Sequence, residues 1–334
     1  MFARATVCNL FLVSKLWYVL QVVHCSRVNV QKLHRVFAVF IWGSVWERTS
    51  RLNLFRSVRN GGLGLTHLFL RQIVNRFIYL RDVGDPFLRT VCEVRLSSAL
   101  PEFVVSSAWV PGRIHGYMKE VVLSCKFLTA RFSFEYLSEV SRKKLYKDLC
   151  DVVLPVPLYR AQYCAGPGQD VLKRVKRMLV PSGVKTFFFY LHTGTLSVKT
   201  WMASKGLFVP WGDHCFLCKK PETIEHVFLD CWDGVFLWDV LQRTLKKDLP
   251  LDVHGIRYLP IENEAGVPFD TMMLLGLHSI WRSRMAMRHA DVDAREAQEY
   301  FRESIASLLE VYKAQKSVPE WIPRVEPLLS MKRF

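Results

Sequence analysis

The chain has 334 residues, half of them apolar, which is more material than one ordinary packed core needs. Charged residues make up 23% and no low-complexity tract occurs, which excludes a largely disordered chain. The formal net charge of +16 favours a polyanion, nucleic acid above all, as the partner.

The positive charge is concentrated in the first 200 residues. Residues 1–90 carry 13 Lys+Arg against 3 Asp+Glu, residues 91–200 carry 16 against 8, and residues 201–334 carry 17 against 19. Arg, which suits phosphate contacts better than Lys, supplies 11 of the first 13 cations. The cations that we expect to contact nucleic acid are Arg48, Arg51, Arg56, Arg59, Arg71, Lys173, Arg174, Lys176 and Arg177. The run 173–177 is equally typical of a solvated helix face.

The sequence predicts an intracellular protein, nuclear or cytoplasmic, that is not secreted and has no membrane partner. Its most apolar stretches, Val7–Ser14 and Leu16–Ser26, are separated by Lys15. Each is shorter than the roughly 20 residues that span a bilayer. No Asn-x-Ser/Thr sequon occurs, and six of the nine cysteines are scattered among mostly apolar neighbours, as in reducing compartments.

Helical spacing of apolar residues dominates the whole chain. Two helices are expected to meet near residues 26–29, with the second ending at Trp42-Gly43. An Arg-rich loop and the glycine-rich turn 61–65 precede a helix over 66–81, and that turn is expected either to line a nucleic-acid channel or to pack between helices. Further helices are predicted over 138–150, after Asp170, from 187, after Ser197, over 233–247, after Asp270 and after Asp293.

Four residues form the motif C-x2-C-x7-H-x4-C: Cys215, Cys218, His226 and Cys231. Three thiolates and one imidazole are a typical ligand set for one tetrahedral zinc ion, and a chance cluster of core cysteines is the alternative. All four ligands come from the protein, so the site is expected to be closed and structural rather than catalytic. Thr223 could cap the segment that carries His226, and Lys219 and Lys220 could offset the net charge of −1. Phe216 and Trp232 are candidates for base stacking beside the motif.

The segment Cys215–Cys231, with Glu222-Thr223 before the His and Trp238 downstream, resembles the zinc-binding region of non-LTR (LINE-type) retrotransposon reverse transcriptases. A second stretch is similar to the thumb of that family, which follows the polymerase palm. It comprises Val36-Phe-Ala-Val-Phe-Ile-Trp-Gly43, then Leu52-Asn-Leu-Phe55, then Gly61-Gly-Leu-Gly-Leu65. Both matches occur in the order that the family shows.

The resemblance implies a mainly α fold, an elongated helical multi-lobed body with a small zinc-knuckle insertion. It implies RNA and/or DNA as partners, together with the upstream polymerase domains of the parent protein, and one structural Zn²⁺. The expected regions are a thumb-like region at 1–90, a basic helical connection at 91–180, the CCHC zinc-binding domain at 181–250 and a carboxyl-terminal helical region at 251–334.

The chain is not expected to be an enzyme. Polymerases of this family hold two metal ions on paired carboxylates, and no Asp-Asp dipeptide occurs here. We therefore expect a carboxyl-terminal, nucleic-acid-binding piece of a retrotransposon protein without palm or endonuclease, in which Met1 is an internal methionine used as a start. The alternative is a zinc-stabilised helical interaction scaffold, decayed or captured, without a nucleic-acid role.

Overall fold

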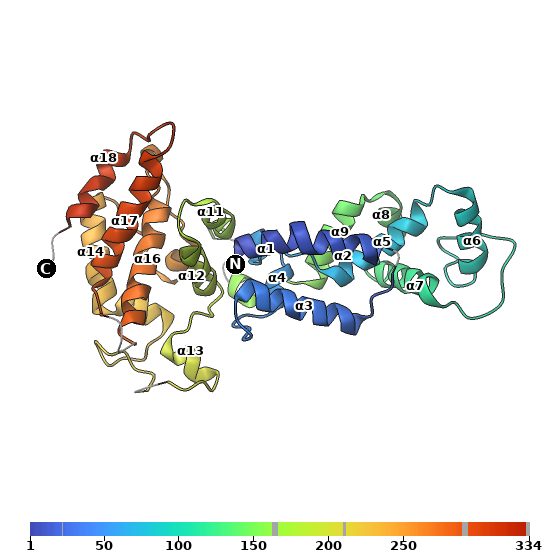
Figure 1. Cartoon of the computed structure of the whole chain (residues 1–334), viewed down its shortest axis with the longest axis horizontal. Helices are drawn as coiled ribbons and strands as arrows, with labels where there is room; N and C mark the ends of the chain where they lie inside the picture. The colour runs from blue at the N-terminus through green and yellow to red at the C-terminus, as the bar shows by residue number, and fades with distance from the viewer. Residues whose placement is uncertain (22, 162–165, 210–211, 289–292, 332–334) are drawn as a thin grey trace. The chain divides into compact units, whose positions relative to one another are not determined.

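A computed structural model describes residues 1–21, 23–161, 166–209, 212–288 and 293–331. Over these residues the chain is helical, and its only β pairing is an isolated antiparallel bridge between His214 and Pro221. The predicted mainly α class is confirmed. The chain divides into an amino-terminal unit, Ala3–Val156, and a carboxyl-terminal unit, Pro157–Phe334 together with Met1–Phe2 (Figure 1).

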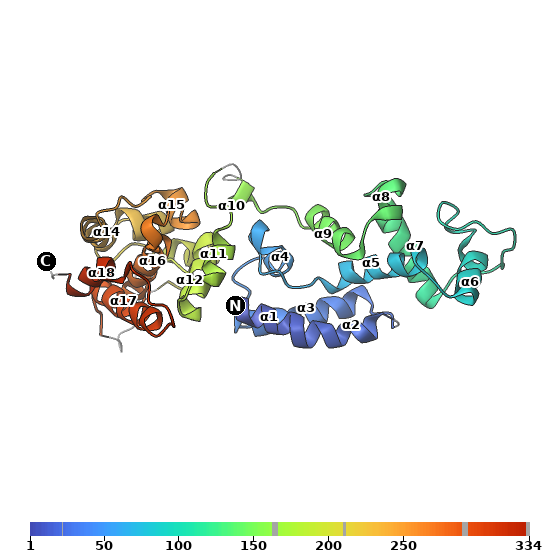
Figure 2. The ribbon, with the colours of Figure 1, turned by 90° about the horizontal axis from the view of Figure 1, so that it is seen from above.

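The amino-terminal unit is organised around one buried helix, α5. This helix packs against α3, α7 and α9, and its Val74, Phe77 and Ile78 side chains are almost fully buried (Figure 2). The helical segments of the unit are α1 (Phe2–Val7), η1 (Cys8–Val13), α2 (Ser14–Leu20), α3 (Arg27–Trp42), α4 (Leu52–Phe55), η2 (Val58–Asn60), α5 (Leu68–Arg81), α6 (Pro86–Leu96), α7 (Gly116–Thr129), α8 (Phe134–Glu139) and α9 (Arg142–Val153).

Local capping explains where several of these helices begin and end. Ser26 accepts a hydrogen bond from the Asn29 N–H at the start of α3, and Gly43 ends that helix in the left-handed conformation at φ 65°. Both ends agree with the prediction. The single helix predicted over 138–150 is wrong, because Val140 is extended and Ser141 caps a new helix, α9.

The glycine-rich turn 61–65 packs against α4 and the residue after it. The Leu63 and Leu65 N–H groups donate to the carbonyls of Asn53 and Leu54, at 2.9 and 2.8 Å. A Cβ atom on Gly62 would lie 2.1 Å from the Arg56 carbonyl oxygen. Close backbone packing is therefore sufficient to explain the glycine at this position.

The carboxyl-terminal unit is built on the helix pair α16 and α17, against which α12 and α14 pack (Figure 1). Phe188 and Phe189 of α12 are completely buried in its core. The helical segments of the unit are α10 (Leu158–Ala161), α11 (Val171–Arg177), α12 (Ser182–His192), α13 (Lys199–Ser204), η3 (His226–Asp230), α14 (Trp232–Leu245), α15 (Val253–Tyr258), η4 (Glu264–Gly266), α16 (Phe269–Ala286), α17 (Ala297–Lys313), α18 (Ile322–Val325) and η5 (Glu326–Ser330).

Four helix caps predicted in this unit are wrong in detail. Asp170 precedes α11, but its carboxylate pairs with Arg174 instead of capping the backbone. The residues that precede α13, α16 and α17 are Val198, Pro268 and Glu296, rather than Ser197, Asp270 and Asp293. Each helix forms at the predicted place, because its buried face rather than its cap determines it.

The elements on either side of position 90 belong to one unit, since α5 packs against α7. The finer limits expected at 90, 180 and 250 stay predictions. Among the described residues, no helix combines the length and the apolar character that crossing a bilayer demands.

Candidate metal centre and basic residues

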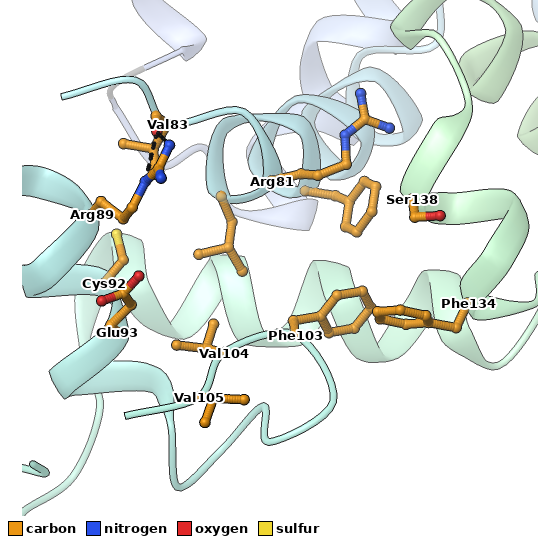
Figure 3. A pocket seen from close by; sticks show the side chains of 12 residues that line it. Arg81, Val83, Arg89, Cys92, Glu93, Phe103, Val104, Val105, Phe134 and Ser138 are labelled. Carbon is orange, nitrogen blue, oxygen red and sulfur yellow. Dashed lines mark hydrogen bonds between the residues drawn. The ribbon is translucent and has the colours of Figure 1, made fainter. Parts of the chain in front are cut away.

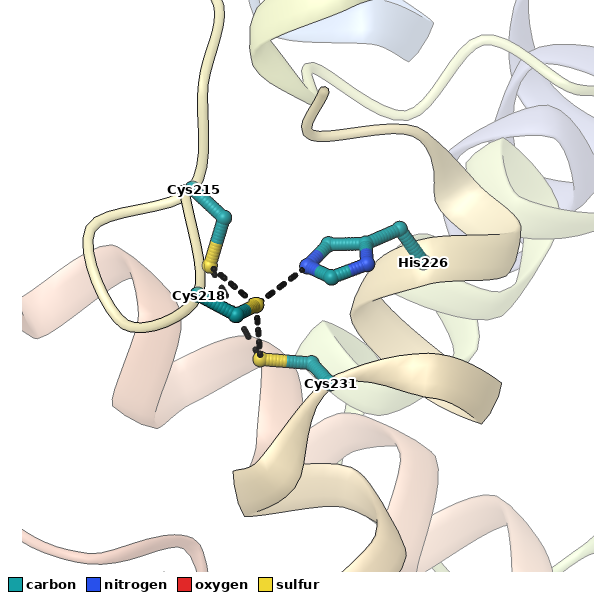
Figure 4. Close-up of side chains that lie close together, drawn as sticks. All are labelled: Cys215, Cys218, His226 and Cys231. Atoms are coloured by element: carbon teal, nitrogen blue, oxygen red, sulfur yellow. Dashed lines mark hydrogen bonds between the residues drawn. The ribbon is translucent and has the colours of Figure 1, made fainter. Parts of the chain in front are cut away.

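The structure brings together the four residues of the C-x2-C-x7-H-x4-C motif (Figure 4). Their ligand atoms all lie within 4.8 Å of one another. The Sγ atom of Cys215 is 3.5 Å from that of Cys218 and 3.7 Å from that of Cys231. A tetrahedral ion with metal–sulfur bonds of roughly 2.3 Å places its sulfur ligands about 3.8 Å apart. The cluster could therefore hold one metal ion, whereas a disulfide would need sulfur atoms about 2.05 Å apart.

A tight turn presents the first two cysteines. The Cys215 N–H donates to the Lys220 carbonyl at 2.7 Å, and the Lys219 N–H donates back to the Cys215 carbonyl at 3.1 Å. Lys219 completes the turn in the left-handed conformation, at φ 60°. The spacing of two residues between the thiols lets both face the same point from this turn.

A π-helical turn presents the other two ligands. The Thr223 hydroxyl caps its start by accepting the His226 N–H at 3.0 Å, as the sequence predicts. In an α-helix, residues five apart would point about 140° away from each other. In η3 the Cys231 N–H instead donates to the His226 carbonyl, five residues back, at 2.8 Å. This wider turn explains how the H-x4-C spacing aims both side chains at one point.

A buried arginine completes the centre. Arg284 of α16 has no exposed surface, and its Nη1 and Nη2 atoms donate to Cys215 Sγ at 3.2 Å and to Cys231 Sγ at 3.0 Å. Three thiolates around a divalent cation leave a net charge of −1, which this guanidinium offsets. The side chains of Lys219 and Lys220 are exposed, so the expectation that they offset the charge is corrected.

The thiols are poised to bind a cation. Burial by itself raises the pKa of the Cys215 thiol, but hydrogen bonds from Cys218 and His226, with the charge of Arg284, outweigh it and lower the pKa to about 6. Burial and the Cys215 thiolate raise the pKa of Cys231. A second thiolate therefore needs a cation beside it, which a metal ion supplies.

An ion-pair network ties the centre to its surroundings. The Glu222 carboxylate is completely buried, pairs with Arg288 and accepts the Lys199 N–H at 3.2 Å. The Lys199 ammonium donates to the His214 carbonyl and lies 3.6 Å from the centroid of the Phe216 ring. This ammonium takes up one face of Phe216, which disfavours that ring for base stacking. Trp232 remains a candidate, because it is 61% exposed.

Two of the predicted basic residues of the amino-terminal unit are occupied by the protein itself. Arg56 is buried and donates to the Pro155 carbonyl at 2.9 Å and to Asn53. Arg51 is half-exposed and paired with the Glu47 carboxylate. Arg48 and Arg59 are exposed, and Arg71 lies over the Trp17 ring, 4.6 Å from its centroid.

The other four predicted residues lie on α11 in the carboxyl-terminal unit. Arg174 binds inward, donating to the Asp270 carboxylate at 2.8 Å and to the carbonyls of Tyr258 and Leu259. Lys173, Lys176 and Arg177 are exposed. Their contact with nucleic acid stays a prediction.

Comparisons of the chain with protein-family models, with curated proteins and with solved structures find no match. The similarity to non-LTR reverse transcriptases therefore rests on the sequence motifs alone.

Proposed function

We propose that the chain is the thumb-to-zinc region of a non-LTR retrotransposon reverse transcriptase. In this proposal its basic amino-terminal unit holds template RNA or target DNA through the phosphate backbone, and one structural zinc ion stabilises its carboxyl-terminal unit. The observation that carries the proposal is the closed Cys3His cluster, whose order and spacing are those of the family motif.

Zinc is the ion that fits this donor set best. Three soft thiolates and one imidazole in a tetrahedral arrangement favour Zn²⁺ over Mg²⁺ or Ca²⁺, which prefer oxygen ligands. With four protein ligands the site has no open position for a substrate or a reactive water, so its role is structural. His226 would bind through Nε2, the ring nitrogen that lies 3.0 Å from Cys218 Sγ.

The charge distribution supports nucleic-acid binding by the amino-terminal unit. Residues 3–156 carry 22 Lys+Arg against 10 Asp+Glu, whereas residues 157–334 carry 24 against 20. Exposed arginines such as Arg48 and Arg59 can neutralise phosphates without reading sequence. The polymerase domains of the parent protein are the proposed second partner, and the chain itself has no Asp-Asp pair for catalysis.

The salt dependence of binding tests this proposal. Six phosphate contacts on a single strand predict a slope of about −4 in log K against log salt. The variant Arg48→Ala/Arg59→Ala is expected to bind more weakly and with a shallower slope by about one to two contacts. Its control is Arg243→Ala in α14, an exposed residue of the carboxyl-terminal unit. Weak binding without salt dependence would favour the alternative, a zinc-stabilised interaction scaffold.

A further inference from the structure

A cleft of about 700 Å³ opens in the amino-terminal unit. Residues of α3, α4, α5, α7 and the end of α9 line it, so it belongs to one unit. The volume falls within the range of small-molecule sites and exceeds what a single nucleotide occupies. No motif of the sequence analysis includes this cleft.

The charge of the lining is positive. Arg27, Arg51 and Arg131 line the cleft, and no Asp or Glu is among the described residues that do so. Glu47 holds Arg51 from outside the lining, and Arg27 and Arg131 are exposed at the surface. Three guanidinium groups without a facing carboxylate favour an anionic ligand.

One of these arginines forms a fixed, flat platform. The Arg131 guanidinium carbon lies 3.6 Å from the centroid of the Phe127 ring, and its Nη1 donates to the Phe127 carbonyl at 2.7 Å. Both contacts hold the guanidinium plane in place before any ligand arrives. Planar guanidinium groups and aromatic rings are the surfaces on which unpaired nucleobases stack.

Two histidines line the same cleft as hydrogen-bond donors. His34 Nε2 accepts the Leu68 N–H, and His67 Nδ1 accepts the Leu70 N–H, each at 3.3 Å. The other nitrogen of each neutral ring therefore carries the proton. Burial lowers the pKa of His34 to about 3 and that of His67 to about 4, so both rings are neutral at pH 7. Neutral N–H donors suit the carbonyl and ring-nitrogen acceptors of a base.

A second hollow in the same unit lacks this combination. Figure 3 shows it, with a volume of about 270 Å³, and the Glu93 carboxylate among its lining. Its two arginines are bound to the protein, Arg89 to the Val83 carbonyl and Arg81 to the Leu137 and Val140 carbonyls. Phosphate would meet a carboxylate there and no available guanidinium.

We propose that the cleft lined by Arg27, Arg51 and Arg131 takes one unpaired nucleotide of a single-stranded nucleic acid. The base stacks on the Arg131–Phe127 platform and donors from the histidines meet its edge, while the adjoining phosphates lie at Arg27 and Arg51. This inference rests on the proposed function and deepens it, because it makes the unit select single strands over duplexes.

The test uses the full chain and single-stranded oligonucleotides that carry one 2-aminopurine, whose fluorescence falls on stacking. The wild type is expected to quench the probe in a single strand and not in a duplex. Arg131→Lys keeps the charge and removes the plane, so we expect the quenching to disappear, the affinity to fall roughly tenfold and the salt slope to stay unchanged. The matched control is Arg113→Lys, an exposed arginine of the same unit outside the cleft. Phe127→Leu removes the ring beneath Arg131 and serves as the second variant.

Each outcome bears on the proposal. Salt-dependent binding with no quenching, or with equal quenching in Arg131→Lys, overturns the nucleotide cleft and leaves the proposed function standing. Binding to no oligonucleotide at all overturns both. Displacement of the probe by a free mononucleotide at the same concentration as by an unlabelled strand would identify a free nucleotide as the ligand and overturn the assignment to a strand.

Discussion

Replacing Arg284 by Met tests how the metal centre is stabilised. The guanidinium is fully buried and donates to two of the three thiol sulfurs, at 3.2 and 3.0 Å. Met fills a similar volume but carries neither donors nor charge. The variant would leave a metal–ligand cluster of net charge −1 in the interior without its counter-ion.

The expected cost follows from these two contacts. A hydrogen bond to a charged group contributes about 1.5–3 kcal/mol, and removing one partner of a buried ion pair costs about 3–5 kcal/mol. Since the guanidinium stabilises the metal-bound form, we expect the apparent zinc affinity of Arg284→Met to fall by roughly 100- to 1,000-fold. Arg284→Lys keeps the charge and is expected to recover part of this loss.

Competition for zinc against a chromophoric chelator measures the affinity, and thermal unfolding of the zinc-loaded chain measures the stability. The matched control is Arg282→Met on the same helix, where the side chain is 38% exposed and pairs with Glu303 at 3.5 Å. Such a surface pair contributes about 0–1 kcal/mol. Equal zinc affinity in Arg284→Met and Arg282→Met would refute the counter-ion role.

Three further predictions follow from the same contacts. Cys218→Ser is expected to abolish stoichiometric zinc binding and to lower the unfolding temperature of the chain, whereas Cys92→Ser, a buried thiol of the other unit, leaves the zinc content at the wild-type value. Trp238→Phe removes the hydrogen bond from Nε1 to the Phe228 carbonyl, 2.7 Å long in the core, and is expected to cost about 1–3 kcal/mol in urea unfolding; a change below 0.5 kcal/mol would count against this bond. Burial lowers the pKa of His67 to about 4, so its contribution to stability is complete above pH 6.5 and is lost as the pH falls toward 4, by up to about 1.4 kcal/mol per pH unit. His67→Asn keeps a cap for the Leu70 N–H and should weaken the pH dependence of urea unfolding between pH 7 and pH 5; an unchanged dependence would contradict the neutral, buried imidazole.

Local signals in the sequence were sufficient for most helices. The ends of α3 at Ser26 and Gly43 follow from capping chemistry, and Asp85 with Pro86 begins α6 as the break at 84–86 indicates. The break at Ser141 was missed because apolar spacing continues across it. Packing between distant helices decides such cases, and one sequence does not contain that information.

The ligands of the centre were predictable from their spacing, but their surroundings were not. Arg284 lies 69 residues from Cys215 and 53 from Cys231, so no local pattern joins them. An arginine in an otherwise apolar helix was the one available signal. The inward contacts of Arg56 and Arg174 were missed for the same reason, since composition does not distinguish a buried guanidinium from a solvated one.

The central claim is that the four-residue cluster holds one zinc ion as a closed structural site. Metal analysis of the purified chain with zinc X-ray absorption on the same sample tests it most directly. The account predicts one zinc per chain, coordinated by three sulfur atoms at about 2.3 Å and one nitrogen at about 2.0 Å. A chain that folds without zinc, or a bound zinc with an oxygen ligand from water, would contradict it.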